Sequence, residues 1–313
     1  MIRSFDWRDV GLVKSLSEQG VCLDSETSLI RGSQPLSSAL LAFLMPGAGA
    51  PTLVWKNDSH AAFGQLRHRF GQEQARVLYI APEYEKAGEG WTHLIDRLGL
   101  EAGGRGAHNL IAEVDENSRE FEALRVAGFA VYARQSVWKL SGALSAPASN
   151  VPLRAVTGGD LIGINTLYAN IVPRLVQQVE PPPSHPRGYV LEQKAELVAF
   201  LHVRRGPRGI WVEPYLHPEV DQLSEATLLT GLSLIPNEKG QPVYVCVRRY
   251  QNWLQDVLLK SGFTALESQA VMVKRLTVRL TEPLLKPLPA IEGKTVTTST
   301  PIIRARVTKS DSD

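Results

Sequence analysis

The sequence predicts an α/β (α+β) protein made of two similar domains, and three observations lead to that prediction. Its 313 residues suit two domains of about 150 residues each. One stretch, residues 76–129, carries strand, turn and helix signals in alternation. The same order of elements then recurs in the second part of the chain, which indicates a duplicated domain.

This stretch contains the most informative turn of the chain. An apolar strand, Val77–Ile80, leads to a turn at Glu85–Gly90, and a helix begins at Trp91. A second strand over Leu110–Val114 and a second helix over Asn117–Val126 follow. The first amides of a helix have no partners inside it, and the helix dipole favours negative charge there. A strand, a glycine turn and a helix start in this order therefore favour phosphate binding.

The same stretch resembles the core motif of the GNAT superfamily of N-acetyltransferases. The run Pro82–Gly90, PEYEKAGEG, aligns with the family's pattern without gaps, and Gly128-Phe129 begins eleven residues after Asn117. The resemblance implies two tandem GNAT-like domains, each with a mixed, mostly antiparallel sheet flanked by helices. It also implies acetyl-CoA as co-substrate, with its pyrophosphate on the turn and its thioester arm between two splayed strands.

The family's cofactor site maps onto a set of residues in and around the turn: Ile80, Ala81, Glu85, Lys86, Ala87, Gly88, Glu89, Gly90, Trp91 and Asn117. Two positions depart from the family's pattern. Glu85 stands where an arginine or glutamine usually heads the turn, and Leu124 stands where a tyrosine often acts as general acid. The resemblance thus supports the fold better than it supports the chemistry.

Local patterns give the other elements of the first domain. We expect a strand at Met1–Phe5, a helix after it, and a second helix over Leu36–Leu44. Alternating residues predict a hairpin of two strands, Thr52–Trp55 and Ala61–Arg69, and final strands follow within Val131–Leu140.

A shift of 134 residues aligns the two copies, because it pairs Phe129 with Phe263. We therefore divide the chain into a GNAT-like domain expected to bind acyl-CoA (residues 1–140), a linker (141–152), a degenerate GNAT-like domain (153–280) and a loosely ordered tail (281–313). The second copy has Val220–Ala226 in place of the glycine turn. We expect this copy not to bind a pyrophosphate, and either to wall the acceptor cleft or to pack against the first copy.

Composition narrows the class of protein. The net charge of +2 gives no case for nucleic acid, and the histidines lack metal-ligand spacing. Cys22 and Cys246 lie far apart, which favours a reducing compartment. The start has no signal-peptide pattern, and the apolar run Ala39–Met45 is too short to span a bilayer. We expect a cytoplasmic protein that binds no membrane, no nucleic acid and no metal; its oligomeric state stays open.

Two residues are candidates for catalysis. Strand alternation places Glu113 beside the expected cleft, at a position that the 134-residue shift maps onto apolar Val247. Glu113 could serve as a base, or it could face solvent or pair with an arginine such as Arg134. Tyr79 could donate a proton to the leaving thiolate, or it could be a core residue with its hydroxyl at the edge.

Three functions agree with these features. The first is an N-acetyltransferase, an enzyme that moves an acetyl or other acyl group from acetyl-CoA to an amine acceptor, either a small molecule or a peptide. The alternative is a non-catalytic GNAT-fold interaction or ligand-sensing module, which Glu85, Leu124 and the missing second glycine turn favour. An aminoacyl transferase would need a transfer RNA, and the near-neutral charge argues mildly against it.

Overall fold

The computed structural model describes residues 1–45, 49–69, 71–140, 144 and 151–276. The predicted tail and most of the predicted linker lie outside these residues. We call residues 1–140 the first half and residues 151–276 the second half.

The first half contains these elements in chain order: β1 (Ile2–Ser4), the 3₁₀ turn η1 (Trp7–Asp9), α1 (Val10–Leu16), β2 (Val21–Cys22), the π-helical turn η2 (Thr27–Arg31), α2 (Pro35–Leu44), β3 (Thr52–Lys56), β4 (Ala61–His68), β5 (Gln74–Ala81), α3 (Tyr84–Ala87), α4 (Glu89–Gly104), β6 (Asn109–Asp115), α5 (Arg119–Val126) and β7 (Ala130–Leu140).

The second half contains β8 (Arg154–Ala155), η3 (Gly158–Asp160), α6 (Leu161–Ile171), α7 (Arg174–Gln177), β9 (Gly188–Gln193), β10 (Glu196–Arg205), β11 (Ile210–Leu216), η4 (Pro218–Leu223), α8 (Ser224–Ser233), β12 (Val243–Arg248), η5 (Arg249–Gln251), α9 (Leu254–Lys260) and β13 (Phe263–Arg275).

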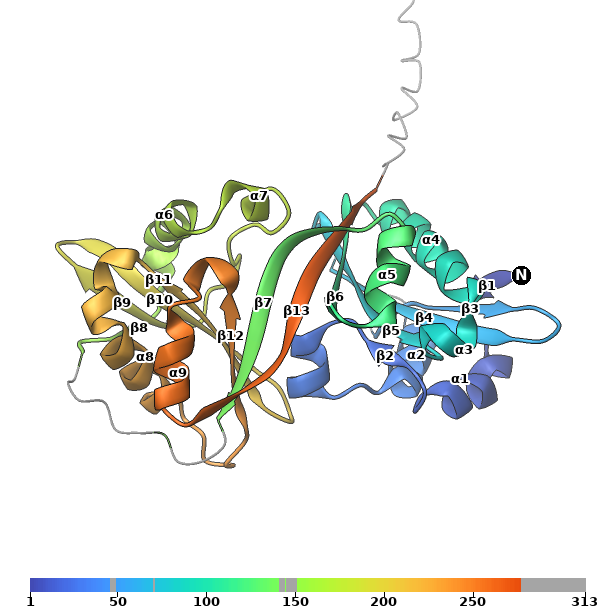
Figure 1. The fold of residues 1–313 in the computed structure, drawn as a ribbon, viewed down its shortest axis with the longest axis horizontal. Helices are drawn as coiled ribbons and strands as arrows, with labels where there is room; N and C mark the ends of the chain where they lie inside the picture. Colours follow the sequence, from blue (N-terminus) through green and yellow to red (C-terminus); the bar gives the residue numbers. More distant parts are fainter. Residues whose placement is uncertain (46–48, 70, 141–143, 145–150, 277–313) are drawn as a thin grey trace, which may run out of the picture. The chain divides into compact units, whose positions relative to one another are not determined.

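The described strands form one mixed sheet in the order β1-β3-β4-β5-β6-β13-β7-β12-β11-β10-β9-β8, with β2 paired to β5 (Figure 1). The pairs β5–β6 and β11–β12 are parallel, and the other pairs are antiparallel. The predicted mixed, mostly antiparallel sheet flanked by helices is therefore confirmed.

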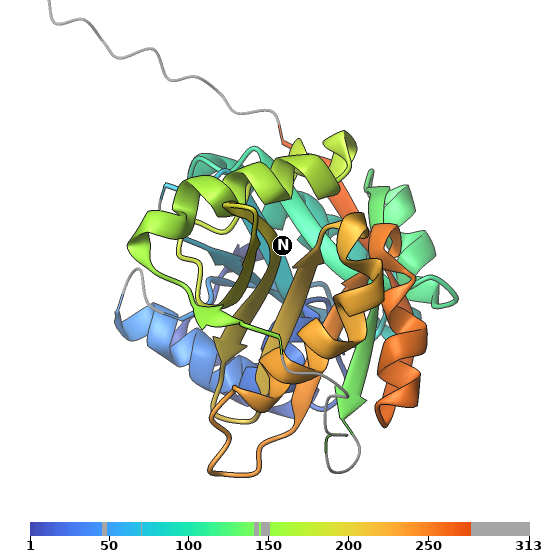
Figure 2. The same cartoon turned by 90° about the vertical axis from the view of Figure 1, so that its left-hand side faces the viewer.

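Helices cover both faces of the sheet in each half. In the first half, α4 and α5 pack on one face, and α1 and α2 pack on the other. In the second half, α6 covers one face of the sheet, and α8 and α9 cover the other (Figure 2). Alternation along β10 accordingly packs Phe200 with α6 residues and Leu201 with residues of α8 and α9. Each half therefore has its own apolar layers.

The two halves exchange their last strands. Strand β13 lies between β6 and β7 of the first half, whereas β7 lies between β13 and β12 of the second half (Figure 1). At the middle of the β7–β13 pair, Gln135 stands opposite Gln269 and donates to its side-chain oxygen over 3.0 Å. The 134-residue shift relates these two glutamines as well as Phe129 and Phe263.

Several elements lie within a few residues of their predicted bounds, including α2, β3, β4 and β6. The turn differs from the prediction, because α3 makes its first part helical and α4 begins at Glu89 instead of Trp91. The predicted final strands within Val131–Leu140 are one strand, β7. No local pattern predicts β2 or η2.

Candidate functional site

The expected cleft lies between β5 and β6. These strands pair in parallel over three rows, the last of which joins Arg76 to Ile111. Beyond this row β5 continues to Ala81 and β6 to Asp115 without pairing to each other. The carboxyl ends of two parallel strands that separate are the place where the resemblance puts the thioester arm of acetyl-CoA.

A segment of the chain itself, Gly20–Ser25, fills this space. Its strand β2 pairs with β5, with Val21 opposite Ile80 and Cys22 opposite Tyr79. The amide of Leu23 donates to the carbonyl of Leu78 over 2.9 Å. The segment therefore uses the backbone edge of β5 that faces the cleft.

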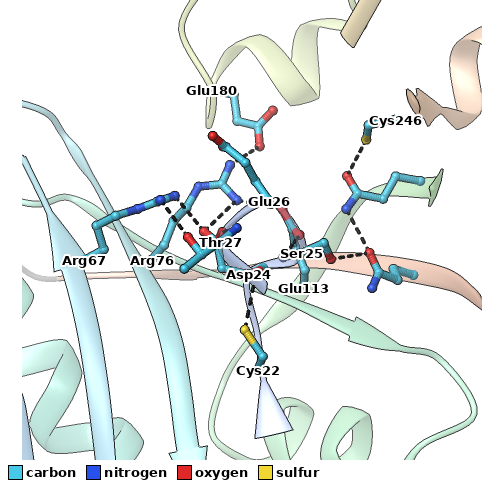
Figure 3. Close-up of polar contacts among 12 residues, drawn as sticks. Cys22, Asp24, Ser25, Glu26, Thr27, Arg67, Arg76, Glu113, Glu180 and Cys246 are labelled. Atoms are coloured by element: carbon cyan, nitrogen blue, oxygen red, sulfur yellow. Dashed lines mark hydrogen bonds and ion pairs between the residues drawn. The ribbon is translucent and has the colours of Figure 1, made fainter. Parts of the chain in front are cut away.

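The same segment also bonds to the other wall of the cleft. The amide of Glu113 on β6 donates to the carbonyl of Leu23 over 2.9 Å. The amide of Ser25 in turn donates to the carboxylate of Glu113 over 2.8 Å (Figure 3). Because Gly20–Ser25 bonds to both strands, it joins the two walls of the cleft as an additional strand would.

The fit of this segment depends on a glycine. A Cβ at Gly20 would lie 2.6 Å from the Cβ of Ala81 and 2.6 Å from the carbonyl oxygen of Ile80. Only a residue without a side chain lets the backbone approach β5 this closely. Leu23 is 1% exposed and belongs to the core under α4. The contact is therefore a packed part of the fold.

The glycine turn is partly closed by its own hydrogen bonds. The amides of Lys86 and Ala87 donate to the carbonyl of Glu83, and the amide of Gly88 donates to that of Tyr84. The amides of Glu89 and Gly90 have no backbone partner within the described ranges. Two amides at the start of α4 thus lack a backbone partner among the described residues, and of the two residues only Glu89 is exposed.

The two glycines of the turn have different roles. Gly88 has a left-handed φ of +53°, and a Cβ there would meet no atom within 4 Å. Gly90 is buried, and a Cβ there would lie 2.8 Å from the ring of Trp55. Gly88 therefore leaves open space beside the turn, whereas Gly90 lets α4 pack on β3.

Acidic side chains of the turn pair locally with cations. Glu85 bonds Arg119 at the start of α5 over 2.8 Å, and both side chains are largely exposed. Lys86 lies 3.8 Å from Glu83. Glu85 and Lys86, two residues of the predicted phosphate site, are thus paired with other side chains.

The remaining predicted cofactor residues have structural contacts. The ring nitrogen of Trp91 donates to the carbonyl of Pro82 over 2.8 Å. The exposed Asn117 bonds Asp115 through its amide and its side chain. Ile80, Ala81 and Ala87 are buried in the core.

Glu113 is buried and ion-paired in this structure. Its carboxylate lies 2.7 Å from a guanidinium nitrogen of Arg76, and Arg134, the partner considered from sequence, bonds Glu116 instead. The Tyr79 hydroxyl donates to the carbonyl of Ser17 over 2.7 Å and accepts from the amide of Gly20 over 3.1 Å. Both groups are thus held by hydrogen bonds or an ion pair within the protein.

Arg76 is the centre of a buried network of charges from both halves (Figure 3). It lies 3.9 Å from Asp24 and 3.2 Å from Glu180 of the second half, besides its bond to Glu113. Arg67 bonds Asp24 over 2.7 Å. Each buried charge thus has an opposite partner, as its loss of hydration requires.

The charges in this network shift the pKa values of their neighbours. Burial raises the pKa of Asp24, but Arg67 and Arg76 outweigh burial, so the pKa lies below its ordinary value. The pKa of Glu180 is lowered in the same way, since Arg248 and Arg76 outweigh the effect of burial. Both carboxylates therefore stay ionised at neutral pH.

The second half closes its own cleft with a side chain. Strands β11 and β12 pair over three rows and then separate. The side chain of Gln251 accepts from the amide of Leu216 over 3.0 Å and donates to the carbonyl of Pro214 over 2.9 Å. Gln251 therefore bonds the edge of β11, as Gly20–Ser25 bonds the edge of β5.

Sequence reasoning missed Asp24, Arg76, Glu180 and Gln251. One signal was available for Arg76: an arginine inside an apolar strand needs an acid, and Glu113 lies on the neighbouring strand. Glu180 and Gln251 bond across long sequence separations that no local pattern shows.

Neither a metal cluster nor a membrane-spanning helix is found in the described part of the chain. There, no group of three or more His, Cys, Asp or Glu side chains could hold a metal ion. Likewise, the helices it contains are too short or too polar to cross a bilayer.

Comparison with solved structures decides the fold. The chain is similar to a GCN5-related N-acetyltransferase from Sphaerobacter thermophilus, with a TM-score of 0.53, 13% identity, and 88% of this chain and 95% of that one covered. The fold is that of the GCN5-related N-acetyltransferases. A tandem GNAT protein from the clavulanic acid biosynthesis pathway is also similar, with a TM-score of 0.50, 14% identity, and 88% and 98% covered.

No family model and no curated protein matches the sequence. The GNAT resemblance in Pro82–Gly90 is thus confirmed at the level of the fold. At this identity, the likeness says nothing further about the reaction.

Proposed function

We propose that the chain is a non-catalytic GNAT-fold binding module, and that it does not transfer acetyl groups through its first-half cleft. One observation supports this proposal most strongly: Gly20–Ser25 bonds both β5 and β6 where the thioester arm would lie. Glu113 and Tyr79, the two candidate catalytic residues, are held by the same segment or by residues beside it.

The free energy needed to open the cleft can be estimated. Exposing Leu23, which is 1% exposed, would cost about 2–3 kcal/mol. Breaking at least three hydrogen bonds between the segment and the strands would add roughly 1 kcal/mol each. A total of about 5 kcal/mol lowers the apparent affinity for acetyl-CoA by three to four orders of magnitude, roughly from micromolar to several millimolar.

Isothermal titration with acetyl-CoA tests the proposal. We expect no saturable binding up to about 1 mM ligand, and no release of CoA with a panel of amines. Saturable one-to-one binding that the Gly88→Trp substitution abolishes, together with CoA release that depends on an amine, would overturn the proposal.

Leu23→Ala distinguishes two reasons why acetyl-CoA would fail to bind: a cleft closed by Gly20–Ser25, or a turn that does not hold the pyrophosphate. The smaller side chain weakens the segment, so acetyl-CoA affinity should rise by about tenfold or more if closure alone prevents binding. Leu66→Ala is the matched control, because Leu66 is fully buried in the same core without contacting Gly20–Ser25 through any hydrogen bond. If neither variant binds, the turn itself does not hold the pyrophosphate.

A second candidate is the N-acetyltransferase, in which acetyl-CoA donates its acetyl group to an amine. It is favoured by the open space at Gly88 and by the free amides of Glu89 and Gly90. In that case Gly20–Ser25 must move before the co-substrate binds, and acetyl-CoA would bind with its pyrophosphate at these amides. CoA release that depends on an amine would support this candidate over the first.

A further inference from the structure

A groove lies at the end of β12, away from the first-half cleft. It consists of two adjoining cavities of about 410 and 320 Å³, which share Arg134 and Arg249 as lining residues. Volumes of this order are typical of small-molecule sites.

The groove exists because β7 is longer than its neighbour. The last pair between the two strands joins Gln135 to Arg248, where β12 ends and the chain turns into η5. Residues Ala130–Arg134 of β7 therefore pair with β13 alone among the described strands. Helix α7 packs across this free edge through Val176, so the edge, α7 and η5 form the walls.

The two cavities differ in chemistry. The larger one is lined mainly by apolar and aromatic side chains: Val131, Tyr132, Pro173, Leu175, Val176 and Tyr250. The smaller one is lined mainly by polar side chains: Glu116, Ser136, Asn252, Gln255, Ser268 and Gln269. A ligand that spans both would need an apolar part and a polar part.

One uncompensated positive charge stands where the cavities meet. Arg134 bonds Glu116 over 2.5 Å, so the two charges cancel. Arg249 is exposed and has no side-chain hydrogen bond or ion pair with any described residue. A single guanidinium is matched by a monoanion, and its planar fork suits a carboxylate.

Tyr250 is the second tyrosine that lines the larger cavity. Its hydroxyl has no hydrogen-bond partner in the part of the chain that the structure describes. Burial raises the pKa of this hydroxyl, so it keeps its proton at neutral pH.

We propose that this groove binds a small amphipathic carboxylate, with its apolar chain in the larger cavity and its carboxylate on Arg249. The proposal goes beyond the binding module described above by naming a site and a ligand class. It does not depend on whether the first-half cleft admits acetyl-CoA, because the groove shares no lining residue with that cleft.

Titration of the full chain with octanoate tests the proposal. We expect saturable binding, with acetate and octanol each binding at least about tenfold more weakly because one lacks the chain and the other the charge. Arg249→Gln should weaken octanoate binding by about 10- to 100-fold, the range for a charge-assisted hydrogen bond. Leu175→Asp should also weaken octanoate binding, because it places a negative charge in the apolar cavity that would hold the chain of the ligand.

Arg174→Gln is the matched control. Arg174 is also exposed, but it does not line either cavity, so octanoate affinity should stay unchanged. The proposal is overturned if octanoate does not bind at millimolar concentration, or if both arginine variants weaken binding equally. Circular dichroism of each variant shows whether a loss reflects unfolding.

Discussion

Glu113→Gln distinguishes a structural role of this carboxylate from a catalytic one. The substitution removes the charge that pairs with Arg76 over 2.7 Å. Glu113 is 6% exposed and Arg76 23% exposed, so water compensates little. If Glu113 serves to hold Arg76 and Gly20–Ser25 in place, its loss must lower the free energy of unfolding.

The size of the loss follows from the remaining contacts. Removing one partner of a buried ion pair costs about 3–5 kcal/mol. Arg76 keeps Glu180 at 3.2 Å and Asp24 at 3.9 Å, and a glutamine oxygen can still accept the Ser25 amide. These contacts place the expected loss near the lower limit, about 3 kcal/mol.

Urea unfolding at pH 7, followed by tryptophan fluorescence and circular dichroism, measures this loss. With an m-value of about 3 kcal/mol/M, the midpoint should fall by roughly 1 M. Glu116→Gln is the control, because the pair between Glu116 and Arg134 is substantially exposed and should contribute under about 1 kcal/mol. A Glu113→Gln midpoint equal to that of the unchanged chain would refute the reasoning.

Three further predictions concern the same architecture. The pKa of Glu180 in the folded protein lies below its ordinary value of 4.5, so the charged carboxylate stabilises the fold above pH 4.5, and this stabilisation is lost as the pH falls toward the folded-state pKa. Glu180→Gln should therefore lower the free energy of unfolding at pH 7 and weaken its dependence on pH in acid, which urea midpoints at several pH values would show. Gly90→Ala should cost about 1–3 kcal/mol, because its Cβ would lie 2.8 Å from Trp55, whereas Gly11→Ala, in α1 with open space around it, should stabilise by up to about 1 kcal/mol; equal urea midpoints for the two variants would contradict this. Residues 1–140 alone lack β13 and leave β6 and β7 without their shared neighbour, so we expect an unfolded or aggregated fragment, and sharp, dispersed NMR signals would show the opposite.

Much of the fold could be predicted from local patterns. Alternation identifies β3 and β4, and the glycine turn marks the start of α4, because these signals depend on neighbours in sequence. The strand exchange could not be predicted in this way. β13 pairs with β6 through residues such as Val271 and Glu113, 158 positions apart, and nothing in either strand specifies its partner.

The sequence motif predicts the backbone shape around the candidate site, but it does not predict which segment fills the cleft. The motif predicts a turn and Glu113 beside two splayed strands, and β5 and β6 pair over three rows and then separate. Val21-Cys22-Leu23 is too short a run to indicate a strand, and its pairing depends on Gly20 fitting against Ala81. A glycine motif thus indicates a backbone shape, while occupation of the cleft depends on residues far from it.

The contacts that join the two halves also hold the first cleft closed. From the first half, Glu26 follows the Gly20–Ser25 segment and bonds Arg204 of the second half over 3.1 Å. From the second half, Glu180 bonds Arg76, which in turn holds Glu113 against Ser25. Moving the segment out of the cleft would therefore disturb buried charges in both halves, where each lost partner is costly. For this reason we expect the clefts to be rigid parts of the interface between the halves, and ligand binding to occur at surfaces that this network leaves free.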